Sequence, residues 1–157
     1  MTSVLSITTY LLLKFLHVSL AIVAVGFNAS YGVWLARAGR EHEHTAFALR
    51  GVKLLDDRFA NPAYGLLLVT GLSMVWVGDL EITAFWLATS LGLYVLAVAL
   101  GLFVYTPTLR RQLTTLSAEG ADSPAFERLS KRGTIVGIIL AVDVLAIVFL
   151  MVTKPTI

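Results

Sequence analysis

A single carboxyl residue, Asp143, lies near the middle of an otherwise apolar stretch formed by residues 133–152. This stretch is long enough to cross a bilayer as one helix. An ionisable group at that depth costs about 2.5 kcal/mol or more, so such residues usually face protein or water and mark a functional site. Asp143 therefore predicts a polar interior in a membrane protein. Proton handling is one chemistry that such a carboxyl permits.

Asn28, in the first apolar segment, is the expected partner of Asp143. At about 1.5 Å per helical residue, Asn28 lies about 14 Å from Arg37, and Asp143 lies about 16 Å from Arg132, so the two share a level. An asparagine can donate to an ionised carboxyl or accept from a protonated one. The pair is either a functional site or a plain contact between helices, which is typically worth only about 0.6 kcal/mol.

A second polar group lies along one face of the first apolar segment. Lys14, His17 and Asn28 are separated by the small residues Ala21 and Ala24, and all five are spaced by three or four positions. His17 is expected just inside the outer interface, with the Lys14 amine one turn above it and able to reach water. The histidine could be a haem or metal ligand, a proton carrier, or an interfacial hydrogen-bonding residue.

A second haem ligand would have to be a methionine. Met74 and Met151 fall at the level of His17, so either could complete an axial pair, although most methionines in apolar helices only fill space. His42 and His44 lie in a charged loop, where their spacing on a helix would point them apart. The chain has no cysteine, which excludes thiolate metal sites and disulfides. We expect no metal site beyond the haem candidate.

These residues are carried by four apolar segments, at about 10–36, 62–77, 84–109 and 133–153. Hydrophobic residues make up 57% of the 157 residues and charged residues 14%, and the mean hydropathy is +0.83. A soluble domain would carry more charge. The sequence therefore predicts one all-α integral membrane domain over 1–157, a bundle of four transmembrane helices in contact with lipid.

The charges predict an orientation for this bundle. Lys and Arg residues concentrate in the loops 37–61 and 110–132, while the link between the second and third helices holds Asp79 and Glu81. By the positive-inside rule, both long loops are cytoplasmic and both termini lie outside. Since orientation already accounts for the basic residues, we expect no nucleic-acid partner.

The two long loops are predicted to contain helix of their own. Ala48, Val52, Leu55 and Phe59 recur at helical spacing, which indicates an amphipathic helix on the cytoplasmic face. Asp56 and Asp57 are interpreted as surface charges around it. The dipeptide Asn61-Pro62 would then open the second membrane helix, and Ser123-Pro124 would start the fourth well inside the cytoplasm, after a turn at 119–123.

Small residues predict where helices approach closely. Gly133, Gly137 and Ala141 form such a stripe on the fourth helix, and Asp143 lies about 120° away from its middle. The fourth helix must therefore meet two neighbours. Both belong to the same chain, or one belongs to another subunit, so a homo-oligomer or a membrane-protein partner remains open.

The sequence also resembles known families. The motif LLKFLHV (12–18), PAYGLLLVTG (62–71), Trp86 and MVTKP (151–155) resemble an uncharacterised bacterial family of four-helix integral membrane proteins. The resemblance implies a multi-pass protein of the bacterial inner (plasma) membrane. More remotely, the Lys14 to His17 pattern is similar to helix one of HemJ-type protoporphyrinogen oxidases and of CopD-like membrane proteins. In the HemJ type that histidine is associated with haem, which implies b-type haem at His17.

Three functions fit these observations. The first is a haem-linked or quinone-linked redox protein that uses His17 and Lys14. The second is a proton-coupled transporter or channel that uses Asp143 and Asn28. The third is a structural or accessory membrane subunit in which the polar residues only fix the register of the helices. Whether the protein is an enzyme is left open by the sequence.

Overall fold

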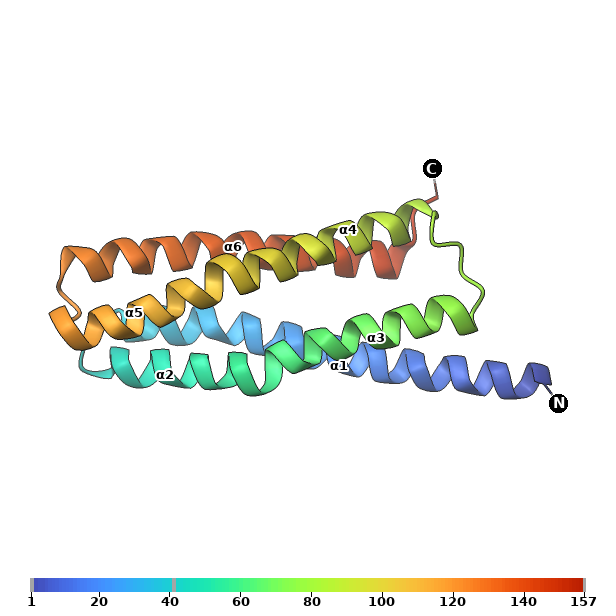
Figure 1. Ribbon diagram of the computed structural model, residues 1–157, viewed down its shortest axis with the longest axis horizontal. Coiled ribbons are helices and arrows are strands. Elements are labelled where there is room, and N and C mark those ends of the chain that lie inside the picture. Colours follow the sequence, from blue (N-terminus) through green and yellow to red (C-terminus); the bar gives the residue numbers. More distant parts are fainter. Residues whose placement is uncertain (1, 41, 157) are drawn as a thin grey trace.

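Four long helical rods make up the protein in the computed structural model, which describes residues 2–40 and 42–156 (Figure 1). The first rod is α1 (Thr2–Ala38), and the fourth is α6 (Pro124–Thr153). The second rod joins α2 (Thr45–Leu55), η2 (Asp56–Ala60) and α3 (Asn61–Val77), and a short turn, η1 (His42–His44), precedes it. The third joins α4 (Phe85–Leu100), η3 (Gly101–Tyr105) and α5 (Thr106–Glu119). All four are long and apolar enough to cross a membrane, and the described residues contain no strand, so the predicted all-α four-helix bundle is confirmed.

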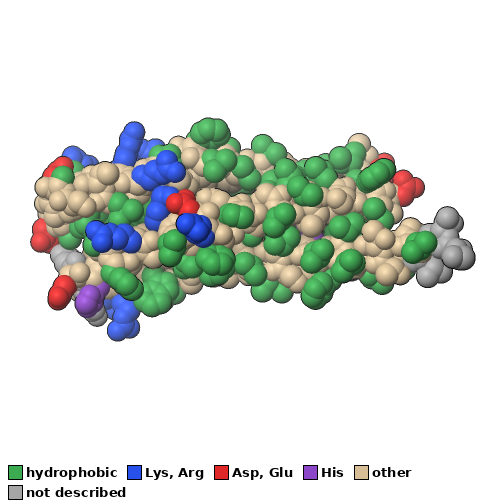
Figure 2. Space-filling model, turned by 60° about the horizontal axis from the view of Figure 1, so that its bottom comes forward, with side chains coloured by type: hydrophobic (Ala, Val, Ile, Leu, Met, Phe, Trp, Pro, Cys, Tyr) green, Lys and Arg blue, Asp and Glu red, His purple; other side chains and the backbone are tan. Residues whose placement is uncertain are grey.

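The two ends of the bundle differ. One end, here called the basic end, holds the turns between the first and second rods and between the third and fourth rods; the other, the termini end, holds both chain ends (Figure 1). Lys and Arg side chains gather at the basic end, and hydrophobic side chains cover the surface along the rest of the molecule (Figure 2). Trp76 is 87% exposed and Phe103 79% exposed. Apolar surface of this extent requires lipid contact.

The buried core lies toward the basic end, where all four rods contribute to it. Its members are Tyr31, Leu49, Val52, Tyr105, Leu109, Phe126 and Val136. Toward the termini end, the bundle becomes two antiparallel helix pairs, α1 with α3 and α4 with α6. Among the described residues, α3 makes no extended contact with α4 or α6, and Figure 1 shows the pairs diverging there. The core therefore holds the two pairs together from one end.

Two π-helical turns interrupt the second and third rods, and each is followed by a proline. The backbone N–H groups of Asn61 and Thr106 donate to the carbonyls of Asp56 and Gly101, five residues back. Pro62 and Pro107 come next; each lacks an N–H, and its ring would clash with a carbonyl of a regular α-helix. The wider π turn accommodates both prolines without ending the rod.

These turns correct two predicted boundaries. The amphipathic segment is not a separate helix on the membrane surface, because α2 continues through η2 into α3 and packs in the core. Ala48 and Val52 are buried as predicted, whereas Phe59 is 50% exposed because the π turn rotates it out of register. The third helix does not end near residue 109, because α5 extends it to Glu119. In the second rod, the proline that suggested a helix boundary, Pro62, lies inside a continuous rod.

The predicted start of the fourth helix is confirmed. The Ser123 side chain accepts a hydrogen bond from the backbone N–H of Phe126 at 3.2 Å, and Pro124 occupies the first turn. Gly120 has φ +85°, which L residues with side chains rarely adopt, so it closes the turn at 119–123. The helix then runs without interruption to Thr153.

Candidate functional site

The His17 ring is held by the helix that packs against α1. Its Nδ1 atom lies 3.0 Å from Thr70 Oγ1 on α3. The Thr70 hydroxyl has one hydrogen, which it directs to the backbone carbonyls of Leu66 at 2.8 Å and Leu67 at 3.2 Å. When the hydroxyl donates to either carbonyl, it accepts from His17, and Nδ1 carries the proton. In that tautomer the lone pair is on Nε2, which could bind a metal ion or accept a proton.

Gly71 leaves room for the His17 ring because it has no side chain. A Cβ atom at residue 71 would lie 3.2 Å from His17 Cε1, so a side chain there would press on the imidazole. Lys14 lies one turn toward the termini end and is exposed, as predicted. The arrangement is an oriented imidazole at the α1/α3 contact with a cation one turn outward.

The two methionines are placed unequally with respect to His17. Met74 is half-buried on α3, four residues beyond Thr70 and therefore on the same face of that helix. Met151 is also half-buried, but it lies on α6, which makes no extended contact with α3 in the part of the chain that the structure describes. Of the two methionines, Met74 is therefore the one on the helix that contacts His17.

Asn28 and Tyr64 belong to a group of hydrogen bonds that joins three of the rods, and the sequence analysis did not predict the role of Tyr64. Its Nδ2 donates to Tyr64 Oη on α3 at 2.7 Å and to the Ala24 carbonyl at 2.8 Å. Tyr94 on α4 donates through its hydroxyl to the Tyr64 carbonyl at 2.7 Å. α1, α3 and α4 are therefore joined by hydrogen bonds where the helix pairs begin to diverge.

Asp143 faces the interior of the bundle. The buried residues Val136, Asp143 and Leu150 are spaced by seven along α6, and Asp143 is 8% exposed. Its Oδ2 atom is buried and has no hydrogen-bond partner. The expected hydrogen bond between Asn28 and Asp143 is not formed, because α1 packs chiefly on α3 and α6 chiefly on α4. The position of each residue along its helix predicted that Asn28 and Asp143 lie at the same depth, but it did not predict which helices pack together.

A second buried carboxyl was misassigned by the sequence analysis. Asp56, interpreted as a surface charge, is 5% exposed at the start of η2. Its Oδ2 lies 3.3 Å from Thr106 Oγ1 and 3.4 Å from Asn61 Nδ2. Asp57 is exposed and paired with Lys53, as expected of a surface charge. The signal was present in the sequence, because residues 45, 49, 52 and 56 form one buried face at helical spacing.

Three tyrosines are electrostatically coupled to the Asp56 carboxyl. Tyr31 is 2% exposed, and its hydroxyl is buried with no partner. The phenols of Tyr31, Tyr64 and Tyr105 all lie within electrostatic range of Asp56. The interior thus holds polar groups at three levels, near His17, near Asn28 and Asp143, and near Asp56.

Comparison with known families decides what kind of protein carries these groups. A family model described as "Predicted integral membrane protein (DUF2269)" matches residues 11–155. The chain belongs to the DUF2269 family. The predicted membership of an uncharacterised family of four-helix membrane proteins is confirmed. No curated protein and no solved structure matches the chain.

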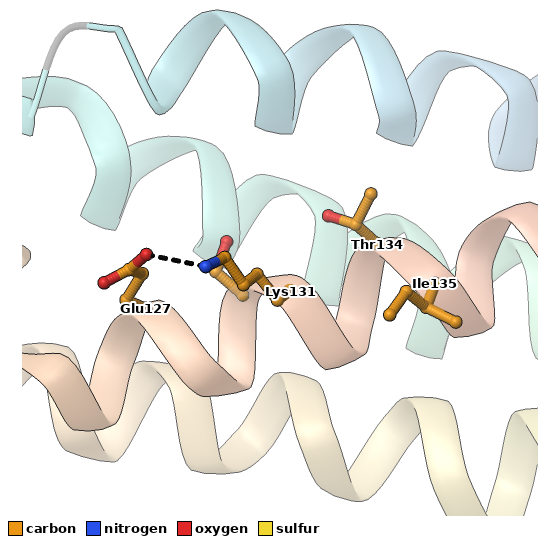
Figure 3. A pocket seen from close by; sticks show the side chains of 5 residues that line it. Glu127, Lys131, Thr134 and Ile135 are labelled. Atoms are coloured by element: carbon orange, nitrogen blue, oxygen red, sulfur yellow. Dashed lines mark ion pairs between the residues drawn. The ribbon is translucent and has the colours of Figure 1, made fainter.

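One hollow of this DUF2269 protein lies away from the three polar levels. It is a shallow depression at the basic end, on one side of α6 (Figure 3). Glu127 and Lys131 form an ion pair at 2.9 Å beside it. Its lining residues are Glu127, Ser130, Lys131, Thr134 and Ile135. An ion pair in such an exposed place contributes little, and this depression lacks the groups for the chemistry considered above.

The predicted loop histidines add no further site to the DUF2269 chain. Glu43 and His44 are exposed, and the side chain of His42 lies outside the described residues. Within the described part of the chain, no group of three His, Cys, Asp or Glu side chains could hold a metal ion. The candidate chemistry therefore rests on single residues, His17, Asp143 and Asp56.

Proposed function

We propose that this DUF2269 protein is a redox-linked membrane protein that binds its redox group, b-type haem or a quinol, at His17. The observation that carries the proposal is the contact between His17 Nδ1 and the Thr70 hydroxyl, which favours the tautomer with its lone pair on Nε2. Histidines that bind metals almost always donate their other ring N–H to a neighbouring group in this way.

The tautomer of His17 also determines which redox groups the imidazole can bind. A neutral imidazole with a free Nε2 can bind haem iron, or it can accept the O–H proton of a quinol, but it cannot donate to a quinone carbonyl. A quinol would therefore be the form that His17 binds, as acceptor of a hydrogen bond from one quinol O–H. Lys14, one turn outward, would attract a haem propionate or another anion.

The test is spectroscopic and needs only the whole protein. We expect protein purified from haem-supplemented cells to show a Soret band that shifts on reduction with dithionite. If quinol is the ligand instead, no Soret band appears, and a quinol analogue quenches the fluorescence of the tryptophans. Absence of both signals would contradict the proposal.

A second candidate function is proton transfer through the bundle, and the orphaned Asp143 Oδ2 favours it. A carboxyl inside a membrane protein with no donor beside it is costly to keep charged and is usually retained for a task. Asn28, Tyr64 and Tyr94 form a hydrogen-bonded group on the three other rods. Such groups exchange protons where water joins them.

The basic end is proposed to face the cytoplasm of a bacterial inner membrane, with both termini outside. The proposal is supported by the Lys and Arg side chains at that end (Figure 2) and by Asp79 and Glu81 in the link at the other end. Because the chain has no cysteine, single cysteines can be introduced at residues 121 and 156. An impermeant maleimide should label only the second in spheroplasts, and labelling of only the first would reverse the orientation.

A further inference from the structure

We propose that Asp56 is the centre of a site for one monovalent cation, formed inside the bundle where η2 faces Thr106 of α5. Asp56 is the first residue of η2, and Thr106 directly follows η3. The site is independent of His17, which lies toward the other end of the bundle. Four groups would supply oxygen ligands: the Asp56 carboxylate, the Thr106 hydroxyl, the Asn61 amide and the Tyr31 phenol.

The charge of the site favours a monovalent ion. Asp56 is buried, and its hydrogen-bonding neighbours Thr106 and Asn61 are uncharged. Lys53, one turn back on the same helix, is paired with Asp57. A buried carboxylate without a counter-charge is strongly disfavoured. One positive charge neutralises it, whereas a divalent ion would leave an excess charge and would normally require more carboxylates.

The spacing of the oxygen and nitrogen atoms also fits an ion. A hydroxyl that donates to a carboxylate normally approaches to about 2.7 Å, but Thr106 Oγ1 is 3.3 Å from Asp56 Oδ2. Asn61 Nδ2 is 3.4 Å away, and its amide can rotate to present oxygen instead. Two ligands at about 2.4 Å from one cation lie about 3.4 Å apart when they subtend a right angle. Both separations agree with that value.

The buried phenol of Tyr31 is the second observation that favours an ion site. Its hydroxyl is buried without a hydrogen bond, although Tyr31 lies in the core and within electrostatic range of Asp56. Buried hydroxyls are nearly always satisfied by protein, water or an ion. Because α1 packs against η2, the phenol oxygen is the candidate for a further ligand of a cation held by Asp56 and Thr106.

A proton is the competing occupant. The titratable groups facing Asp56 are Tyr31 from α1, Tyr105 from η3 and Tyr64 from α3, with Lys53 and Asp57 on its own rod. A proton would neutralise the carboxyl, but it would not account for the long separation from Thr106 or for the unpartnered phenol. Sodium accounts for the charge, the spacing and the phenol together.

The experiment measures the thermal unfolding of the whole purified protein in detergent as NaCl replaces choline chloride at constant ionic strength. Sodium should raise the unfolding midpoint by a few degrees and then saturate, because a ligand bound only to the folded state stabilises it. Choline is too large to enter the site. Asp56→Asn should remove the sodium-dependent shift, and Thr106→Val should increase the sodium concentration needed for it several-fold.

Glu127→Gln is the control, since it removes an exposed carboxyl that is paired with Lys131 and leaves the Lys53–Asp57 pair intact. This variant should keep the full sodium response. If Asp56→Asn does not fold, Thr106→Val and Tyr31→Phe still test the site through their sodium dependence. A wild-type protein with no sodium-specific shift, or one whose midpoint responds only to pH, would overturn the proposal.

Discussion

Replacing His17 with alanine should abolish the binding of haem or quinol, and it should leave the four helical rods folded. His17 is the only histidine in the predicted membrane segments, so no other imidazole in the chain can replace it. Its hydrogen bond to Thr70 is one contact among many between α1 and α3, so its loss costs the fold only about 1 kcal/mol. The measurement is the Soret absorbance, or the quenching by a quinol analogue, per mole of folded protein.

Thr70→Val should weaken the same binding without abolishing it. Valine keeps the shape of threonine but cannot accept the Nδ1 hydrogen, so the imidazole is no longer fixed in one tautomer and orientation. Removing such a supporting group typically weakens metal binding about 10-fold to 100-fold. A Thr70→Ser variant retains the hydroxyl and should restore most of the affinity.

Variants of the two methionines test whether a bound haem has a second ligand from this chain. If haem has a second axial ligand from this chain, Met74→Leu should change the reduced spectrum, whereas Met151→Leu should not. Leucine fills nearly the same volume, so both variants should fold. A Soret band that survives in His17→Ala would show that the ligand is elsewhere and would end the proposal.

The fold was accessible from the sequence because membrane helices leave a simple signal. A run of some 20 apolar residues has few alternatives in a bilayer, where every backbone polar group must be satisfied within the chain. Residues 133–153 illustrate this, since their length alone predicted most of α6. The Ser123 cap then fixed the start of that helix, because a serine followed by proline satisfies the free N–H groups of a first turn.

The two π turns were not predicted. As a result, Asp56 was expected on the surface, although it is buried. A proline after a polar segment usually marks a helix start, so Asn61-Pro62 was interpreted as a boundary and Asp56 was placed on the surface. The structure instead keeps the helix continuous across Pro62, and this carries Asp56 into the core. Pro107 was equally visible. Two prolines within otherwise helical rods are the sequence signal for such turns.

The partners of His17 and Asn28 could not be predicted, because one helix does not specify which neighbour it meets. Periodicity placed both residues on one face of α1, and that face does pack against α3. Thr70 and Tyr64 were unremarkable in an apolar segment. Only the antiparallel register of the two helices brings each of them to its partner on α1.

Replacing Asp143 with leucine should raise the stability of the bundle by about 1–3 kcal/mol and stop any proton transfer through it. Oδ2 is buried without a donor, so the carboxyl costs free energy that an apolar side chain of similar size recovers. The midpoint of thermal unfolding in detergent measures the first effect. A pH-sensitive dye inside proteoliposomes measures the second.

Asp143→Asn separates these two effects, because asparagine keeps a polar group in the same place but cannot exchange a proton. It should stop proton transfer without the gain in stability. If leucine instead destabilises the protein by about 3 kcal/mol or more, Asp143 has a partner that one chain does not contain, since removing half of a buried pair costs about that much. A loss of stability seen in lipid but not in detergent-separated monomers would place that partner on a neighbouring subunit, and the carboxyl would then act in assembly instead of transport.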